Sequence, residues 1–202
     1  MVEPAEPKSI GELQEILRES YAVQVWARKI DASVENVRPV VLRAFAGNVD
    51  FFPEDQVATF KASTPLVEMQ QELAGFKLCV PCRPRTGTLA GSYMTAGDGW
   101  RDWVIGGTYM LPDGTVCKSG SHAVKNVAGY DVHRFLAGTR GSLAICLDLT
   151  LRLYPLVSDD QGPEISHENS PVSDPTQIRF MQRAKEVFDP SRKLNPGVWG
   201  FM

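Results

Sequence analysis

Two short segments rich in glycine and hydroxyl side chains are the parts of this sequence whose residue types could bind a ligand. They run from Gly87 to Ser92 and from Gly138 to Ser142. Glycine lets backbone N–H groups approach a ligand closely, and successive N–H groups can form a concave site for a phosphate or a flavin carbonyl. Each segment could equally be a simple turn, and Gly138 could end the helix expected over 131–137. The residue types leave both interpretations open.

A second cluster of reactive side chains lies between Lys125 and Asp131. Lys125 and Tyr130 could supply a positive charge and a hydroxyl group to a ligand or to proton transfer. Alternatively, Asn126 bonds the neighbouring backbone and Asp131 caps the helix that follows. The cluster is either one side of a ligand site or a structural loop.

The four cysteines do not predict a metal site. Cys79 and Cys82 have C-x-x-C spacing, but a zinc site needs four ligands and a redox pair belongs at the start of a helix. The other cysteines and the three histidines match no standard ligand spacing. The motifs G-x-S-x-G, G-x-x-x-x-G-K-[ST] and G-x-G-x-x-G are also absent, so hydrolase, P-loop and Rossmann interpretations have no support.

Periodicity predicts the strands that position these segments. Residues 145–153 alternate apolar and polar side chains, which predicts a long strand with one buried face. Asp113 and Gly114 separate two β-prone runs and predict a hairpin. A further strand is expected over 56–62, and short strands are expected between 21 and 50.

Capping signals predict three helices. Ser9 opens an S-x-x-E capping box. Thr64 is expected to cap a helix that begins with Pro65, and Asp174 is expected to cap a last helix that begins with Pro175. The apolar stripe of that last helix is expected from Ile178, Met181, Ala184 and Val187.

Length and charge restrict the class of protein. A chain of 202 residues, 43% of them hydrophobic, can form one domain with a real core and has room for a second small lobe. A net charge of -3 offers no attraction to nucleic acid. Since the N-terminus has no secretory signal pattern and no apolar run reaches the roughly 20 residues that span a bilayer, we expect a cytoplasmic protein, peripheral to the membrane only through partners.

The segment Lys125 to Pro155, KNVAGYDVHRFLAGTRGSLAICLDLTLRLYP, resembles a signature of the glycolate oxidase E subunit, KNVAGYD-x-x-R-x-x-x-G-[ST]-x-G-x-L-[GA]. Upstream, STPL resembles the family's AGTPL helix, RPRTGTLAGSYMTAG resembles its TLGG loop, and Arg101-Asp102 matches its RD pair. FDPSRKLNPG matches the C-terminal end of the wider group of FAD-linked oxidases. The resemblance covers roughly residues 45–155 and 175–197.

This resemblance implies an α+β fold: the two-lobed, PCMH-type FAD-binding domain of the vanillyl-alcohol-oxidase superfamily, without a substrate cap domain. It implies a FAD-binding subunit of a glycolate-oxidase-like (2-hydroxy acid) oxidoreductase complex, beside a catalytic flavoprotein subunit and an iron–sulfur subunit. The alternative is a flavin-free, non-catalytic assembly subunit that keeps the fold and binds partner proteins. The implied organisation is a disordered tail (1–8), a FAD-binding-type domain (9–155) with a small lobe (9–65) and a larger lobe (66–155), a linker (156–173) and a C-terminal helix and tail (174–202).

The resemblance also assigns cofactor-binding residues, while no catalytic residue and no metal ligand is assigned. The residues implied for FAD are Thr86, Gly87, Thr88, Leu89, Ala90, Gly91, Ser92, Arg101, Asp102, Lys125, Asn126, Gly129, Tyr130, Asp131, Gly138, Gly141, Ser142 and Ile145.

Two features depart from the family pattern. The small lobe of relatives carries a glycine-rich pyrophosphate turn after a strand, but the corresponding VQVWARKIDASVENV contains no glycine. Relatives also insert a cap domain before FDPSRKLNPG, where this chain has only the polar linker 156–173. Because a cap positions the 2-hydroxy acid against the flavin, its loss favours a subunit over an independent enzyme.

Overall fold

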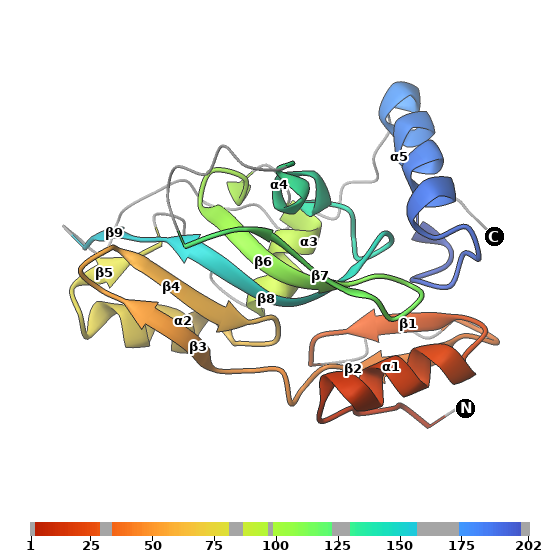
Figure 1. Ribbon diagram of the computed structural model, residues 1–202, viewed down its shortest axis with the longest axis horizontal. Helices are drawn as coiled ribbons and strands as arrows, with labels where there is room; N and C mark the ends of the chain where they lie inside the picture. Colours follow the sequence, from red (N-terminus) through yellow and green to blue (C-terminus); the bar gives the residue numbers. More distant parts are fainter. Residues whose placement is uncertain are drawn as a thin grey trace.

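The computed structural model of the chain describes residues 3–28, 34–80, 87–96, 99–122, 130–156 and 174–198. They form a small lobe, a larger lobe and a C-terminal helix that stands beside the point where the lobes meet (Figure 1). The small lobe consists of α1 (Ile10–Glu19), β1 (Val23–Trp26) and β2 (Arg38–Val41). The other elements are β3 (Asn48–Phe52), β4 (Val57–Lys61), α2 (Leu66–Ala74), β5 (Leu78–Cys79), α3 (Leu89–Ala96), β6 (Val104–Met110), β7 (Val116–Gly120), α4 (Val132–Leu136), β8 (Ile145–Arg152), β9 (Tyr154–Pro155) and α5 (Pro175–Phe188).

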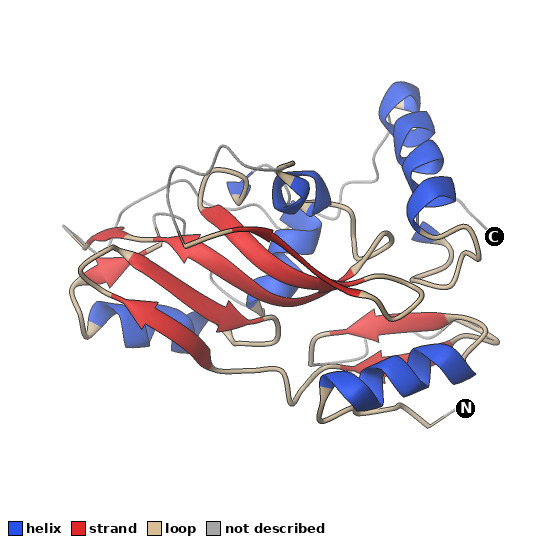
Figure 2. Cartoon of the chain, in the orientation of Figure 1, coloured by secondary structure: helices blue, strands red, loops and turns tan. Residues whose placement is uncertain are grey.

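The small lobe packs one helix on two parallel strands (Figure 2). The predicted cap of α1 is confirmed, because the Ser9 Oγ accepts a hydrogen bond from the backbone N–H of Glu12 at 3.2 Å. Leu13 and Leu17 then bury the inner face of the helix. The predicted loose tail before this helix is wrong for residues 3–8, where Ala5 pairs with the edge of β2 through two backbone hydrogen bonds. An exposed strand edge has unpaired N–H and C=O groups, and this segment satisfies them.

The larger lobe is built on a five-stranded antiparallel sheet with the order β3-β4-β8-β6-β7. The predicted strand at β8 is confirmed, but the expectation of one buried face is wrong. Cys146 and Thr150 are buried as well as the leucines, because β8 lies between β4 and β6 and is covered on both faces. The predicted hairpin is also confirmed, with Gly114 in the left-handed region at φ 87° and its N–H bonded to the carbonyl of Leu111.

The boundary between the lobes differs from the predicted one at residue 65. β3 and β4 belong to the large sheet, since β4 pairs with β8 from Val57 opposite Arg152 onward. The small lobe therefore ends between β2 and β3. Thr64 is not the helix cap that its position suggested: α2 begins after Pro65, and the Thr64 hydroxyl instead donates to the carbonyl of Lys61 at 2.7 Å. The predicted linker 156–173 lies almost entirely outside the described residues.

α5 begins as predicted, with the Asp174 carboxylate accepting from the N–H of Thr176 and Pro175 in the first position. Its predicted apolar stripe is only partly correct. Met181 is buried, but Val187 is 78% exposed, and the buried position one turn on from Met181 belongs to Lys185, which is 2% exposed. None of the described helices is long and apolar enough to cross a membrane.

The buried Lys185 forms an ion pair whose polar atoms all have partners. Its Nζ donates to Asp189 Oδ2 and to the carbonyl oxygens of Ser142 and Leu194, each at 2.6 Å. The fully buried Asp189 also accepts from the backbone N–H groups of Lys193 and Leu194. This network attaches the last helix and the segment after it to the turn that precedes β8.

We predict that Lys185→Met destabilises the protein by about 3–5 kcal/mol, because it leaves the buried carboxylate of Asp189 without its cation. Arg183→Met removes the same charge from an exposed position of the same helix and should change stability by less than about 0.5 kcal/mol. Urea unfolding of both variants measures the difference. Equal stability of the two variants would contradict this account of the pair.

Burial also makes stability depend on pH through His133 of α4. The side chain is 3% exposed, its Nδ1 lies 3.0 Å from the Ser119 Oγ, and burial lowers the pKa of the imidazole. Below the unfolded pKa, at about 6.5, the unfolded chain therefore binds a proton that the folded chain resists.

We predict that stability falls with decreasing pH below about 6.5, by up to about 1.4 kcal/mol per pH unit from this group, until the folded pKa is reached. His133→Gln should lose less stability than the wild type between about pH 7.5 and pH 5. Urea midpoints across this range test it, and parallel losses in the two proteins would show that His133 is not responsible.

Candidate functional site

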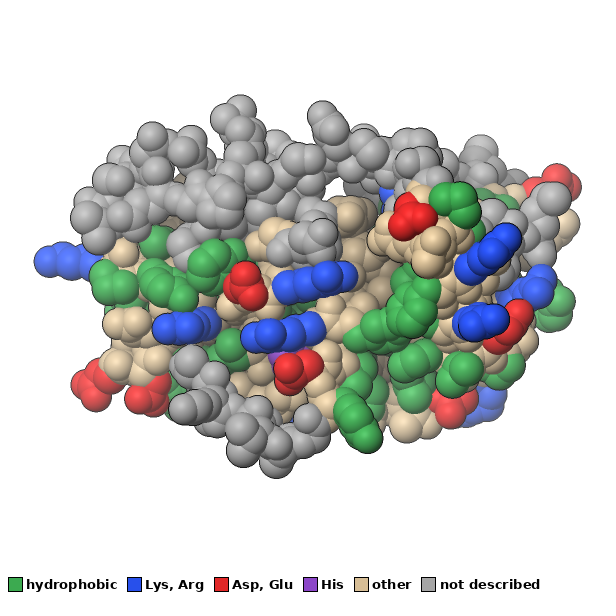
Figure 3. All heavy atoms as spheres, turned by 90° about the horizontal axis from the view of Figure 1, so that it is seen from above, with side chains coloured by type: hydrophobic (Ala, Val, Ile, Leu, Met, Phe, Trp, Pro, Cys, Tyr) green, Lys and Arg blue, Asp and Glu red, His purple; other side chains and the backbone are tan. Residues whose placement is uncertain are grey.

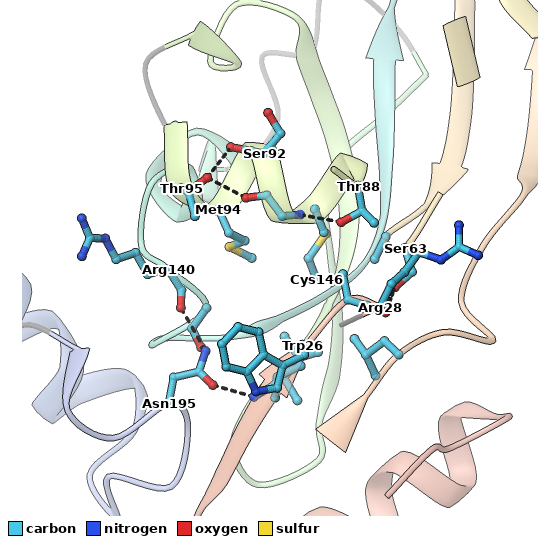
Figure 4. A pocket seen from close by; sticks show the side chains of 18 of the residues that line it. Trp26, Arg28, Ser63, Thr88, Ser92, Met94, Thr95, Arg140, Cys146 and Asn195 are labelled. Carbon is cyan, nitrogen blue, oxygen red and sulfur yellow. Dashed lines mark hydrogen bonds between the residues drawn. The ribbon is translucent and has the colours of Figure 1, made fainter. Parts of the chain in front are cut away.

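A cavity of about 640 Å³ lies where the two lobes meet. Its walls come from β1 and the residues after it, the start of α3, the turn at 140–141, the start of β8 and the C-terminal segment (Figure 4). Small and apolar side chains make up much of the lining, among them Leu42, Ala62, Ala90, Met94 and Ala144. A cavity of this size and composition is typical of a small-molecule site.

The first turn of α3 forms one wall and has already used its N–H groups. The N–H of Leu89 donates to the carbonyl of Thr64, that of Ala90 donates to Ala62, and that of Gly91 donates to the hydroxyl of Thr88, its helix cap. Gly91 allows this cap, since a Cβ at that position would lie 2.9 Å from the Thr88 Oγ1. The structure thus shows a capped helix start at 88–91, while the assignment of 87–92 to a ligand stays a prediction.

The turn between α4 and β8 forms a second wall, and three of its backbone N–H groups also bond within the protein. The N–H of Gly138 donates to the carbonyl of Tyr93, that of Arg140 to Met94, and that of Ser142 to Thr139. Gly138 ends the helix in the left-handed region at φ 78°, as the turn interpretation predicted. These three N–H groups therefore do not form the concave phosphate site that was the alternative.

Asn195 joins the two lobes beside the cavity. Its Oδ1 accepts from the N–H of Val25 in β1 at 2.7 Å, while its Nδ2 donates to the carbonyls of Arg140 and Gly141 at 2.9 and 3.1 Å. Its backbone N–H donates to the carbonyl of Val23. Gly141 is required here, because a Cβ would lie 2.7 Å from the Asn195 Nδ2. One amide thus fixes the small lobe against the turn of the larger lobe.

The cavity has little charge inside it. Arg28 and Arg140 lie at its edge, and Figure 4 shows both guanidinium groups directed away from the centre. Burial, and then the neighbouring Asp148, raise the pKa of the Cys146 thiol well above its ordinary value, so this lining residue stays protonated. No carboxylate or histidine is among the described lining residues, and these residues include no group of three metal-binding side chains. The arrangement is suited to binding a ligand and offers no acid–base pair.

One polar atom in the lining lacks a partner. The Nε1 of Trp26, the last residue of β1, is buried and makes no hydrogen bond within the described structure.

On the outer face shown in Figure 3, basic side chains lie beside acidic and hydrophobic ones and do not gather into a basic patch.

The structure brings part of the implied cofactor set together. Tyr130 is 93% exposed, Leu89 lies in the core, Ser142 is held by Lys185, and Thr86 lies outside the described residues. Those that line the cavity are Gly87, Thr88, Ala90, Gly91, Ser92, Gly141 and Ile145. Those that do not line it are Leu89, Arg101, Asp102, Tyr130, Asp131, Gly138 and Ser142. Lys125, Asn126 and Gly129 also fall outside the described residues.

Two parts of the lining were not predicted: residues 24–28 and, separately, Asn195. The end of a short strand in the small lobe was the available signal for the first group, since the resemblance places a cofactor turn there. Asn195 lies in the FDPSRKLNPG segment that carries part of the resemblance, but its role at the cavity is not evident from that segment, because its partners lie 54, 55 and 170 residues away.

Comparison with known proteins confirms the resemblance, although no family model matches the chain. The chain is similar to glycolate oxidase subunit GlcE of Escherichia coli, with 29% identity over 126 residues, which is 56% of this chain and 36% of that protein. It is also similar to a mitochondrial D-lactate dehydrogenase (cytochrome) of Arabidopsis thaliana, with 41% identity over 71 residues, or 35% of this chain and 12% of that protein. The chain spans about a third or less of the length of these relatives.

The solved structure of an alkyldihydroxyacetonephosphate synthase has the same fold. Its TM-score is 0.60 at 15% sequence identity, and the match covers 75% of this chain and 31% of that one. This likeness confirms the predicted fold class, an α+β fold that the chain shares with that synthase.

The geometry of Asn195 generates a prediction about the junction of the lobes. Asn195→Asp leaves two carbonyls without a donor and places a negative charge beside them, so we expect a loss of about 2–4 kcal/mol of unfolding free energy. The matched control is Asn36→Asp, at an exposed position, which should change stability by less than about 0.5 kcal/mol. Chemical denaturation measures the unfolding free energy of both variants. An Asn195→Asp protein as stable as the control would contradict the role of the Asn195 amide in joining the lobes.

Proposed function

We propose that this chain is a flavin-binding subunit of a 2-hydroxy acid oxidoreductase complex of the glycolate oxidase type, with FAD in the cavity between the lobes. The observation that carries the proposal is the position of the cavity, at the lobe junction of a fold that the chain shares with FAD-binding oxidases. The relatives support the substrate class, because glycolate and D-lactate, which appear in their names, are both 2-hydroxy acids.

The residues of the cavity suit parts of FAD to different degrees. Ala62, Ala90 and Ala144 leave room between the walls for a flat ring. The N–H groups of 89–91 in the first turn and of Gly138, Arg140 and Ser142 in the second are used internally, so these groups do not bind the pyrophosphate.

The chemistry divides between the cofactor and the protein. FAD supplies the capacity to accept a hydride from the carbon that carries the hydroxyl group of the acid. The described walls orient a ligand and exclude water, and the protonated thiol of Cys146 neither removes a proton nor attacks the substrate. Because these walls offer no base, the proposal places substrate oxidation with a catalytic flavoprotein subunit and electron transfer with an iron–sulfur subunit.

A second candidate function is a flavin-free assembly subunit that uses the same fold to bind partner proteins. Several backbone N–H groups of the two turns already bond to carbonyl oxygens of the protein, and the small lobe lacks a glycine-rich segment. Both observations favour this candidate. Co-purification of a partner protein with a colourless chain would support it.

The purified protein should be yellow, or should take up one FAD per chain with a rise in melting temperature, because a ligand that binds only the folded state stabilises it. Ala90→Leu fills part of the cavity and should weaken FAD binding about tenfold, which corresponds to about 1.4 kcal/mol. Ala74→Leu makes the same change at an exposed position at the end of α2 and should leave affinity unchanged. Fluorescence titration measures the affinities. A colourless protein whose melting temperature FAD does not raise would overturn the proposal.

A further inference from the structure

Helix α5 exposes large apolar side chains along one face. In the view of Figure 1, its first turns rise above the other described elements. Phe180 is 59% exposed and Val187 is 78% exposed. The two residues are seven positions apart, so they lie on the same side of the helix, about 10 Å from each other along its axis. Ala184 lies between them on this side, and its small side chain leaves room between the two larger ones.

Aromatic rings continue this apolar stripe onto α4. The ring of Phe180 lies 6.0 Å from that of Phe135, which in turn lies 5.7 Å from the ring of Phe188. Phe135 and Phe188 are partly buried against the core of the larger lobe, whereas Phe180 is mostly exposed. Single exposed apolar side chains are common on soluble proteins, but neighbouring ones that form a continuous surface are a feature of interaction sites.

Arginines line one edge of the stripe. Arg179 and Arg183 are exposed, and neither forms an ion pair within the part of the chain that the structure describes. Glu186 lies on the same side of α5 but further from the stripe. The larger lobe covers the opposite edge, where Met181 and Lys185 are buried. A partner that contacts the stripe therefore also meets its arginine edge.

These charges decide between the possible occupants. Two copies of the chain that paired through the stripe about a two-fold axis would bring Arg183 of one copy near Arg183 of the other, because such an interface places the same residues opposite each other. Like charges brought together disfavour this pairing. A membrane surface is also a poor fit. A helix in a bilayer interface presents a wide apolar face, but Met181 of α5 points into the protein.

We propose that the stripe of Phe180, Ala184 and Val187 is a docking surface for an amphipathic helix of a different protein subunit. The apolar side chains of that helix pack on the stripe, one of them in the space over Ala184. Its acidic side chains pair with Arg179 and Arg183, which have no other ion pair. The inference rests on the proposed membership of a complex, and it applies whether or not the cavity holds flavin.

Site-specific cross-linking tests the kind of partner. A photoactivatable phenylalanine analogue in place of Val187, in the full chain within its source organism, should cross-link to a different protein. Mass spectrometry should place the cross-link in a segment that forms an amphipathic helix with acidic side chains along one edge. The same analogue in place of Val67, which is 48% exposed on α2, is the matched control and should not give this product. Adducts to a second copy of the chain, to lipid, to a segment of other character or to nothing would overturn the proposal.

A synthetic peptide with the sequence of the cross-linked segment then measures affinity. Val187→Glu and Arg183→Glu should each weaken its binding about tenfold, because each places a carboxylate against the acidic helix. Val67→Glu should leave the affinity at the wild-type value. Wild-type affinity in both α5 variants would overturn the docking surface. FAD titration separates the two proposals: the α5 variants should bind FAD as the wild type does, and a wild-type chain that binds the peptide without FAD would overturn only the flavin part of the proposed function.

Discussion

The ammonium group of Lys185 lies between the carboxylate of Asp189 and two carbonyl oxygens, out of contact with water, and the arrangement of the lobes depends on this network. One of those carbonyls belongs to Ser142, in the turn before β8, and the other to Leu194 in the C-terminal segment. The same segment places the Lys193 Nζ on the carbonyl of Leu17, at the end of α1. A buried charge with every partner in place holds one geometry, because any displacement leaves part of it unpaired.

That constraint contributes to keeping a cavity open where the two lobes meet. One hydrophobic cluster, around Phe60 and Leu149, lies in the larger lobe, and the other packs Leu13 and Val40 of the small lobe against Ile145 and Leu147 of β8. Hydrophobic packing therefore joins the lobes beside the cavity. Polar bonds from Asn195 to Val25 and to the 140–141 turn fix the separation, and the small side chains of the walls leave the space open.

The donors around the cavity also bear on what the protein does. Several backbone N–H groups at the start of α3 and in the 138–142 turn are used to build the walls. The lining includes a protonated thiol and has no acid–base pair among its described residues.

Local patterns in the sequence determined the elements whose signals act over a few residues. The strand over 145–153, the turn at Asp113-Gly114 and the caps at Ser9 and Asp174 each depend on neighbouring residues, and the structure confirms each of them. The motif between Lys125 and Pro155 indicated the fold class through resemblance.

Tertiary structure alone decided features that depend on partners far along the chain. The covering of both faces of β8, the membership of β3 and β4 in the large sheet and the burial of Lys185 all arise from pairings across many residues. Whether 87–92 is a ligand loop or a helix start likewise depends on carbonyls from 62 and 64. A hydrogen-bond donor is available to a ligand only if the fold leaves it unpaired, and the sequence does not state which donors those are.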